Sequence, residues 1–111
     1  MKIANRDAGE FAAQRLPFTG SNLFGQVIDE THDVYAVFSY GHHFPLYVWV
    51  KDRWFANTDS RSQSTSRHYS QARPVPHSQH SQLTPLNTEQ MKVLVRDGYT
   101  GLVALRLKGV V

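Results

Sequence analysis

The chain has 111 residues, 41% of them hydrophobic and 19% charged, which predicts one soluble globular domain with a modest core. Twelve Lys and Arg against nine Asp and Glu give a net charge of +3, which permits contact with nucleic acid without requiring it. The chain lacks cysteine, which excludes disulfides, thiolate zinc sites and cysteine nucleophiles. It shows no membrane-length apolar run and no signal-peptide pattern, so we expect a cytoplasmic protein without a membrane partner.

The N-terminal part of the chain combines one predicted helix with one predicted strand. Phe11, Ala12 and Leu16 share a helical face, which indicates a helix near residues 6–15. Glycines and small polar residues then mark a turn, and a short strand is expected at Leu23–Ile28.

The segment Val34–Asn57 holds eight of the chain's thirteen aromatic residues and is rich in valine. Gly41 and Pro45 interrupt it, so the segment is typical of an antiparallel meander. Val34–Tyr40 is apolar on both faces and is expected to be a central strand. The short stretch Gly41–Phe44 would close a hairpin.

Two kinds of side chain alternate in Leu46–Lys51. One predicted face is aliphatic and belongs in the core; it consists of Leu46, Val48 and Val50. The other is aromatic and ends in a lysine; it consists of Tyr47, Trp49 and Lys51. A tight turn at residues 51–53 precedes a last strand at 54–57.

Residues 59–85 differ in composition, with seven serines, three prolines and almost no apolar anchors. The tripeptide His-Ser-Gln occurs twice in succession at 77–82, and no acidic residue lies between Asp59 and Glu89. We expect a long loop within a single domain of residues 1–111, either flexible or functional.

The C-terminal region returns to helical patterns. Asn87 with Gln90 three residues later forms a capping-box pattern, and Gly98 marks the end of that helix. Residues 99–107 fit a second helix, which we favour, or a strand. The predicted fold is α+β, with a small antiparallel sheet of three to four strands packed on one face by N- and C-terminal helices.

Two groups of residues suggest binding. Tyr47, Trp49 and Trp54 suit a platform on which nucleic-acid bases stack, although burial beneath a helix is the alternative. Arginines among hydroxyls and amides suit phosphate, although the same residues also cap helices or tie loops to a sheet. The predicted binding residues are Tyr47, Trp49, Lys51, Arg53, Arg61, Arg67, His68, Gln71 and Arg73.

We predict no catalytic residue, no metal site and no cofactor. Neither a G-x-S-x-G motif nor a phosphate-binding glycine loop is present. No carboxylate lies near His68 in the sequence, so we expect it to form a structural hydrogen bond to the sheet. The alternative is a small metal- or histidine-dependent nuclease that uses His68 with His42 or His43.

Three motifs follow one another along the chain: SYGHHFPLYV at 39–48, WFAN at 54–57 and TSRHYSQ at 65–71. In this order the chain resembles a group of small proteins carried by bacteriophages and plasmids. Their shared pattern is S-Y-G-x-H-x-P-L-Y-V, then W-x-x-N, then T-S-x-H-x-x-Q. The resemblance covers roughly two thirds of the chain, with LFG at 23–25 as a weaker element.

This resemblance implies an origin in a mobile element. Small accessory proteins of such genomes often block host defences, as anti-CRISPR proteins do, by binding a protein or nucleoprotein. We therefore predict a non-enzymatic protein that binds and inhibits a host nucleic-acid-handling complex such as a CRISPR effector. DNA or RNA phosphates are a further predicted partner. A nucleic-acid-binding or regulatory homodimer, built on the aromatic sheet face, is an alternative alongside the nuclease.

Overall fold

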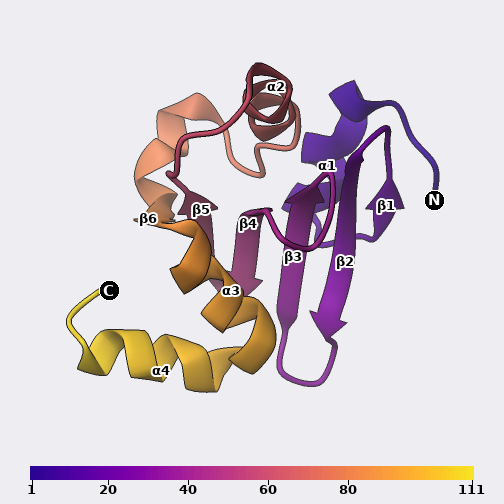
Figure 1. The fold of residues 1–111 in the computed structure, drawn as a ribbon. Coiled ribbons are helices and arrows are strands. Elements are labelled where there is room, and N and C mark those ends of the chain that lie inside the picture. Colours follow the sequence, from indigo (N-terminus) through magenta and orange to yellow (C-terminus); the bar gives the residue numbers. More distant parts are fainter.

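A computed structural model describes residues 1–111 as one mixed sheet with helices on both faces (Figure 1). The strands are β1 (Phe18–Thr19), β2 (Leu23–Asp29), β3 (Val34–Ser39), β4 (Pro45–Val50), β5 (Arg53–Asn57) and β6 (Leu83–Leu86). The helices are α1 (Ala8–Ala13), α2 (Gln63–Gln71), α3 (Thr88–Asp97) and α4 (Tyr99–Leu107), with short 3₁₀ helices η1 (Asn5–Asp7) and η2 (His77–Gln82). The predicted α+β class is confirmed. None of these helices combines the length and apolar character that crossing a bilayer requires.

The six strands lie in chain order from β1 to β6, which Figure 1 shows at opposite ends of the sheet. All neighbours are antiparallel except β5 and β6, which are parallel. The prediction of three to four antiparallel strands is therefore wrong. It missed β1, which has two residues, and β6, which lies in the serine-rich segment. A parallel neighbour needs a long crossover, and residues 58–82 with α2 provide it.

Each face of the sheet carries its own core cluster, and we name the faces after them. The aromatic face, covered by α1 and the end of α2, includes Tyr35, Tyr47 and Trp54. The aliphatic face, covered by α3 and α4, includes Val48 and Val50. The prediction that both chain ends pack on one face is wrong. Because β3 is buried along its whole length, the sheet needs cover on both sides.

Two residues of the segment 46–51 do not lie on the faces that the alternation predicted. Leu46 packs in the aromatic cluster, because the β3–β4 register shifts by one residue at a bulge beside it. Lys51 leaves the strand, because it and Asp52 have φ values of 42° and 70° in the tight β4–β5 turn. Its ammonium lies 4.3 Å from the ring centre of Tyr99 in α4, and so points away from the aromatic face.

Most of the predicted loop at 59–85 is regular secondary structure, namely α2, η2 and the start of β6, so that prediction is also wrong. Ser62 caps α2, because its Oγ accepts a hydrogen bond of 3.2 Å from the amide of Thr65. Thr65, His68 and Ala72 are buried at helical spacing along one side of the segment. A polar helix face escapes a search for apolar periodicity, which explains the error.

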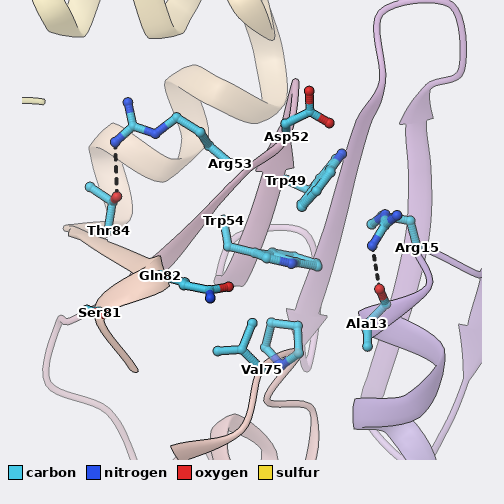
Figure 2. A pocket seen from close by; sticks show the side chains of 11 residues that line it. Ala13, Arg15, Trp49, Asp52, Arg53, Trp54, Val75, Ser81, Gln82 and Thr84 are labelled. Carbon is cyan, nitrogen blue, oxygen red and sulfur yellow. Dashed lines mark hydrogen bonds between the residues drawn. The ribbon is translucent and has the colours of Figure 1, made fainter. Parts of the chain in front are cut away.

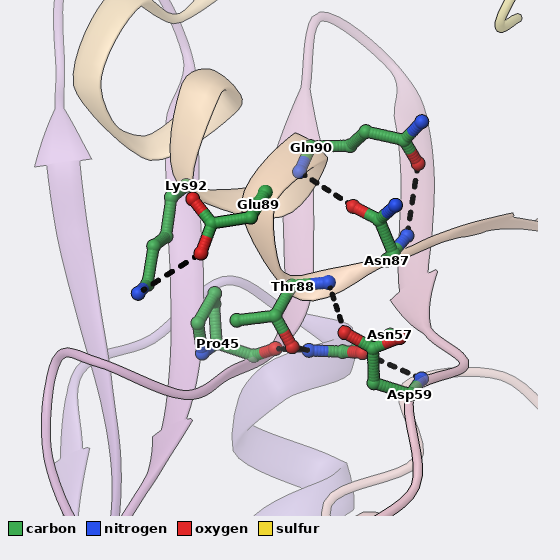
Figure 3. Close-up of polar contacts among 8 residues, drawn as sticks. All are labelled: Pro45, Asn57, Asp59, Asn87, Thr88, Glu89, Gln90 and Lys92. Atoms are coloured by element: carbon green, nitrogen blue, oxygen red, sulfur yellow. Dashed lines mark hydrogen bonds and ion pairs between the residues drawn. The ribbon is translucent and has the colours of Figure 1, made fainter.

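The predictions for the C-terminal region are confirmed. Asn87 Oδ1 accepts from the Gln90 amide at 2.8 Å, and Gln90 Oε1 accepts from the Asn87 amide at 2.9 Å (Figure 3). Gly98 has φ 56° and separates α3 from α4, so residues 99–107 are a helix and not a strand.

Asn57 joins three parts of the fold at the end of β5 (Figure 3). Its side-chain amide donates to the carbonyl of Pro45 at 2.8 Å and to Thr88 Oγ1 at 3.0 Å. Its Oδ1 accepts from the amide of Asp59 at 2.9 Å. Because Asn57 is fully buried, these bonds fix β4, β5 and the start of α3 together.

Candidate functional site

Arg96 is the only arginine of the chain that forms an ion pair. The others include Arg6 in η1 and a group of four in or beside α1 and α2: Arg15, Arg61, Arg67 and Arg73. The ion pairs of the structure lie elsewhere and join His32 with Asp29, Lys92 with Glu89, and Arg96 with Asp97. The chain from Ser60 to Thr88 contains no acidic residue. No acidic residue of this segment offsets the charge of Arg61, Arg67 and Arg73, which is available to an anionic partner. Arg15, in contrast, lines pockets together with Asp52 and with Asp29, Glu30 and Asp33.

The guanidinium of Arg61 is held by a tyrosine of α2 and by two backbone carbonyls, because its Nη1 donates to Asp59 at 3.1 Å and to Asn57 at 3.4 Å. The rings of Tyr47 and Tyr69 are 4.8 Å apart, and the Tyr47 hydroxyl donates to the Tyr69 carbonyl at 2.6 Å. Arg61 lies 4.1 Å from the Tyr69 ring centre, a cation–π arrangement. Burial, and secondarily the neighbouring Tyr69, raises the pKa of the Tyr47 hydroxyl far above its ordinary value. Tyr47 is fully buried, so its predicted role in a stacking platform is wrong.

A pocket of about 560 Å³ opens beside this region (Figure 2). Its aromatic wall is the cross-strand pair Trp49 and Trp54, whose rings meet edge-on with centres 5.3 Å apart. Figure 2 shows the Trp54 indole across the centre of the view, with Val75 below it and Gln82 beside it. The other lining residues are Ala13, Arg15, Asp52, Arg53, Pro74, Ser81 and Thr84.

Arg15 covers part of the aromatic wall. Its guanidinium lies 4.2 Å from the Trp49 ring centre and donates to the carbonyl of Ala13. The other arginine of the lining, Arg53, bonds a second lining residue, because its Nη2 donates to Thr84 Oγ1 at 3.1 Å (Figure 2). Arg15 is therefore the lining cation that lies on the indole wall.

The indole nitrogen of Trp49 has no hydrogen-bond partner although the atom is buried. An indole N–H can only donate, so no alternative protonation satisfies it. An unsatisfied buried donor costs about 1–3 kcal/mol, which marks Trp49 as a position that favours an incoming acceptor.

His68 forms the hydrogen bond to the sheet that its sequence context predicted. Its Nδ1 lies 2.8 Å from Ser39 Oγ in β3, and Ser39 donates its single hydrogen to Thr65 Oγ1 at 3.1 Å. Nδ1 of His68 is therefore the donor in the first bond. Burial, and secondarily the positive charge of Arg67, lowers the pKa of His68 below its ordinary value. The residue is thus a structural link between α2 and β3 whose charged form is disfavoured by burial.

The histidines proposed for a nuclease do not meet. His42 packs against Phe38 and its Nε2 lies 3.0 Å from Gln26 Oε1, whereas His68 contacts Ser39. Phe38 and Ser39 are successive residues of β3, so they point to opposite faces of the sheet. No group of three or more His, Asp or Glu side chains is arranged to hold a metal ion.

The remaining predicted binding residues divide between exposed and structural positions. Trp49 is half-buried in the pocket wall, and Arg67 is exposed on α2. Arg73 Nη2 lies 2.6 Å from His80 Nδ1. Gln71 is half-buried, with its Oε1 buried and unpaired. Lys51 points away from this face, as described above, whereas Arg53 lines the pocket and bonds Thr84. The aromatic face needed for the alternative homodimer is covered by α1, α2 and residues 72–83.

Sequence reasoning missed Arg15, which looked like an ordinary residue at the end of a helix. The available signal is that the helix ends close to Pro17 without a glycine, so any left-handed residue that ends it is not a glycine. What Arg15 contacts depends on Trp49, 34 positions later, and that proximity is a property of the fold.

Scans of this chain against protein-family models, curated proteins and solved structures found no match.

Proposed function

We propose that this chain is a non-enzymatic accessory protein of a phage or plasmid that binds and inhibits a host nucleic-acid-handling complex, such as a CRISPR effector. The observation that carries the proposal is the group of four arginines without ion pairs on the aromatic face. In this proposal they contact nucleic-acid phosphates within the complex.

Arginine suits this role because its planar guanidinium binds phosphate through two parallel hydrogen bonds. Arg15 and Arg61 are already oriented by aromatic rings, so little side-chain entropy is lost when they bind. Arg67 is exposed on α2 and supplies a free guanidinium. The absence of acidic residues from 60 to 88 removes the repulsion that a polyanion would otherwise meet there.

Salt dependence tests the nucleic-acid contact. We expect a labelled single-stranded oligonucleotide to bind in fluorescence anisotropy with an affinity that falls steeply as salt rises. The double variant Arg67→Ala/Arg73→Ala should bind more weakly, and its log–log salt slope should fall by about 0.7 for each lost phosphate contact. Arg96→Ala/Arg106→Ala, which removes the same charge from the helices of the aliphatic face, is the control. If the wild type binds no oligonucleotide at low salt, the nucleic-acid contact is refuted.

The nuclease alternative makes a different prediction for the same preparation. An inhibitor acts in proportion to its amount and ignores chelators, whereas an enzyme turns over. We expect no hydrolysis of DNA, RNA or nucleotides with Mg²⁺, Mn²⁺ or Zn²⁺, and stoichiometric inhibition of a sensitive CRISPR effector. Multiple-turnover cleavage that disappears in folded His68→Ala protein would overturn the proposal and establish the nuclease.

A further inference from the structure

Arg15 occupies the position after α1 at which glycine is usual. The amide of Leu16 donates to the carbonyl of Phe11 and the amide of Arg15 to that of Ala12, both at 2.9 Å. This pair of bonds is a Schellman motif, whose terminating residue adopts a left-handed conformation. Arg15 has φ 53°, a conformation that glycine adopts without strain and an arginine does not. Helix termination alone therefore does not explain the arginine.

The contacts of the Arg15 side chain explain why an arginine occupies this position. It reaches the pocket at the Trp49 ring, opposite Gln82 in the view of Figure 2. A glycine at this position would end α1 equally well and would leave the indole wall of the pocket without a guanidinium. The backbone strain is thus tolerated at the point where a cation meets an aromatic wall, as is common at binding sites.

We infer that this pocket binds a nucleotide, with the base against the indole wall and the phosphate on Arg15. The inference rests on the proposed function in taking nucleic acid as the partner chemistry. A volume of about 560 Å³ lies within the range of small-ligand sites. Indole rings bind the flat face of any base, and a guanidinium binds phosphate.

Polar groups for the edge of the base are also present. The side chain of Gln82, on the segment facing the indoles, offers both a donor and an acceptor. The indole N–H of Trp49, which has no partner within the protein, is a further donor in the pocket wall. The ligand is either a free mononucleotide or an unpaired nucleotide of a single strand. Duplex bases are excluded because they are stacked inside the helix.

Intrinsic fluorescence reports on this pocket directly, because the chain's two tryptophans both line it. The probes are adenosine monophosphate, adenosine, inorganic phosphate, a short single-stranded oligonucleotide and its duplex, each corrected for absorbance with free tryptophan. We expect quenching by the mononucleotide or the single strand, with weaker effects from adenosine and phosphate alone. Quenching by the mononucleotide identifies a free nucleotide as a sufficient ligand, and quenching by the oligonucleotide alone identifies a single strand.

Arg15→Gly separates binding from folding. We expect its melting temperature to equal or exceed that of the wild type, while the affinity measured by quenching falls about tenfold or more, because a charge-assisted contact is lost. Arg106→Gln, an equal loss of charge at an exposed position of α4, should bind as the wild type does. Unchanged affinity in Arg15→Gly overturns the inference. So does the absence of quenching when anisotropy still shows oligonucleotide binding, and that result leaves the proposed function intact. Absence of both signals overturns both.

Discussion

The two faces of the sheet differ in whether their polar groups have hydrogen-bond and ion-pair partners. On the aliphatic face, α3 is closed by a reciprocal capping box and its charged residues form ion pairs. On the aromatic face, four buried polar atoms have no hydrogen-bond partner: Trp49 Nε1, Arg61 Nε, Gln71 Oε1 and Arg73 Nε. Buried groups are nearly always paired in folded proteins, so the concentration of unpaired atoms on one side is informative.

This difference indicates that the aliphatic face mainly stabilises the fold and that the aromatic face is available for binding. The aliphatic face satisfies its own polar groups and buries Val48, Met91 and Leu94 completely, so it is expected to dominate stability. The aromatic face keeps arginines without ion pairs and donors without acceptors, which a bound anion would satisfy. Substitutions that separate the two roles test this division.

The largest expected effect comes from charging the aliphatic core. Val48 is fully buried, so Val48→Asp places an unpaired carboxylate beneath α3 and should lower the free energy of unfolding by about 4 kcal/mol or more. Thermal melting by circular dichroism measures it. Val27→Asp, at a strand position that is 45% exposed, is the matched control and should cost about 1 kcal/mol. A melting temperature of Val48→Asp close to that of the wild type would contradict the assignment of this core.

Asn57 is the next most sensitive residue, because its side chain joins β4, β5 and α3. Asn57→Ala leaves the buried carbonyl of Pro45 without its donor, and should lower the free energy of unfolding by about 3 kcal/mol. Urea denaturation measures the change. Ser60→Ala, at a nearby exposed position, should be neutral. Equal stability of the two variants would mean that Asn57 does not hold these elements together.

His68 should contribute less to stability, and its contribution should depend on pH. His68→Ala should lower the free energy of unfolding by about 1–2 kcal/mol, because Ser39 loses a buried partner. The folded-state pKa of His68 is lowered by burial, so below its ordinary value of 6.5 the unfolded chain binds more protons. The contribution of His68 to the free energy of unfolding is therefore fully present above pH 6.5, and it is lost as the pH falls through the folded-state pKa.

We expect the wild type to melt at a lower temperature at pH 5 than at pH 7.5, and His68→Ala to show a smaller difference. His77→Ala, in exposed η2, should keep the full pH difference. A pH difference that survives unchanged in His68→Ala would place its origin in another group.

The smallest effect is expected where the aromatic face has unpaired atoms. Arg73→Met keeps the aliphatic part of the side chain and removes both a buried nitrogen without a partner and the exposed contact of Nη2 with His80, so stability should change by about 0.5 kcal/mol or less. Asn87→Ala removes the cap of α3 and should cost about 1 kcal/mol. If Arg73→Met is the more harmful change, Arg73 is a structural residue.

The sequence predicted the elements whose signals are local. The capping box at Asn87 and Gln90 and the apolar pattern of β3 depend on neighbouring residues only, and both are confirmed. Helix α2 was missed because its buried side is formed by Thr65 and His68, which become core residues only through Ser39 in β3. Strand β6 was missed because four residues carry little pattern.

The candidate site was predicted in part for the same reason. Trp49 and Arg67 could be selected as aromatic and basic residues, and Trp49 lies on the face predicted from the alternation in its strand. The burial of Tyr47 beneath Tyr69 depends on the packing of α2, and the place of Arg15 depends on how α1 meets β4. Such contacts join distant segments, so no local pattern reveals them.

Matched removal of charge from the two faces tests the central claim most directly. One variant carries Arg15→Gln, Arg67→Gln and Arg73→Gln; the other carries Arg96→Gln, Arg106→Gln and Lys108→Gln. Both lose the same formal charge, and anisotropy with a labelled single-stranded oligonucleotide at one fixed salt concentration compares them. We expect the first variant to lose about a hundredfold in affinity and the second to remain within about twofold of the wild type. Equal losses in the two variants would show that net charge, and not the aromatic face, determines binding.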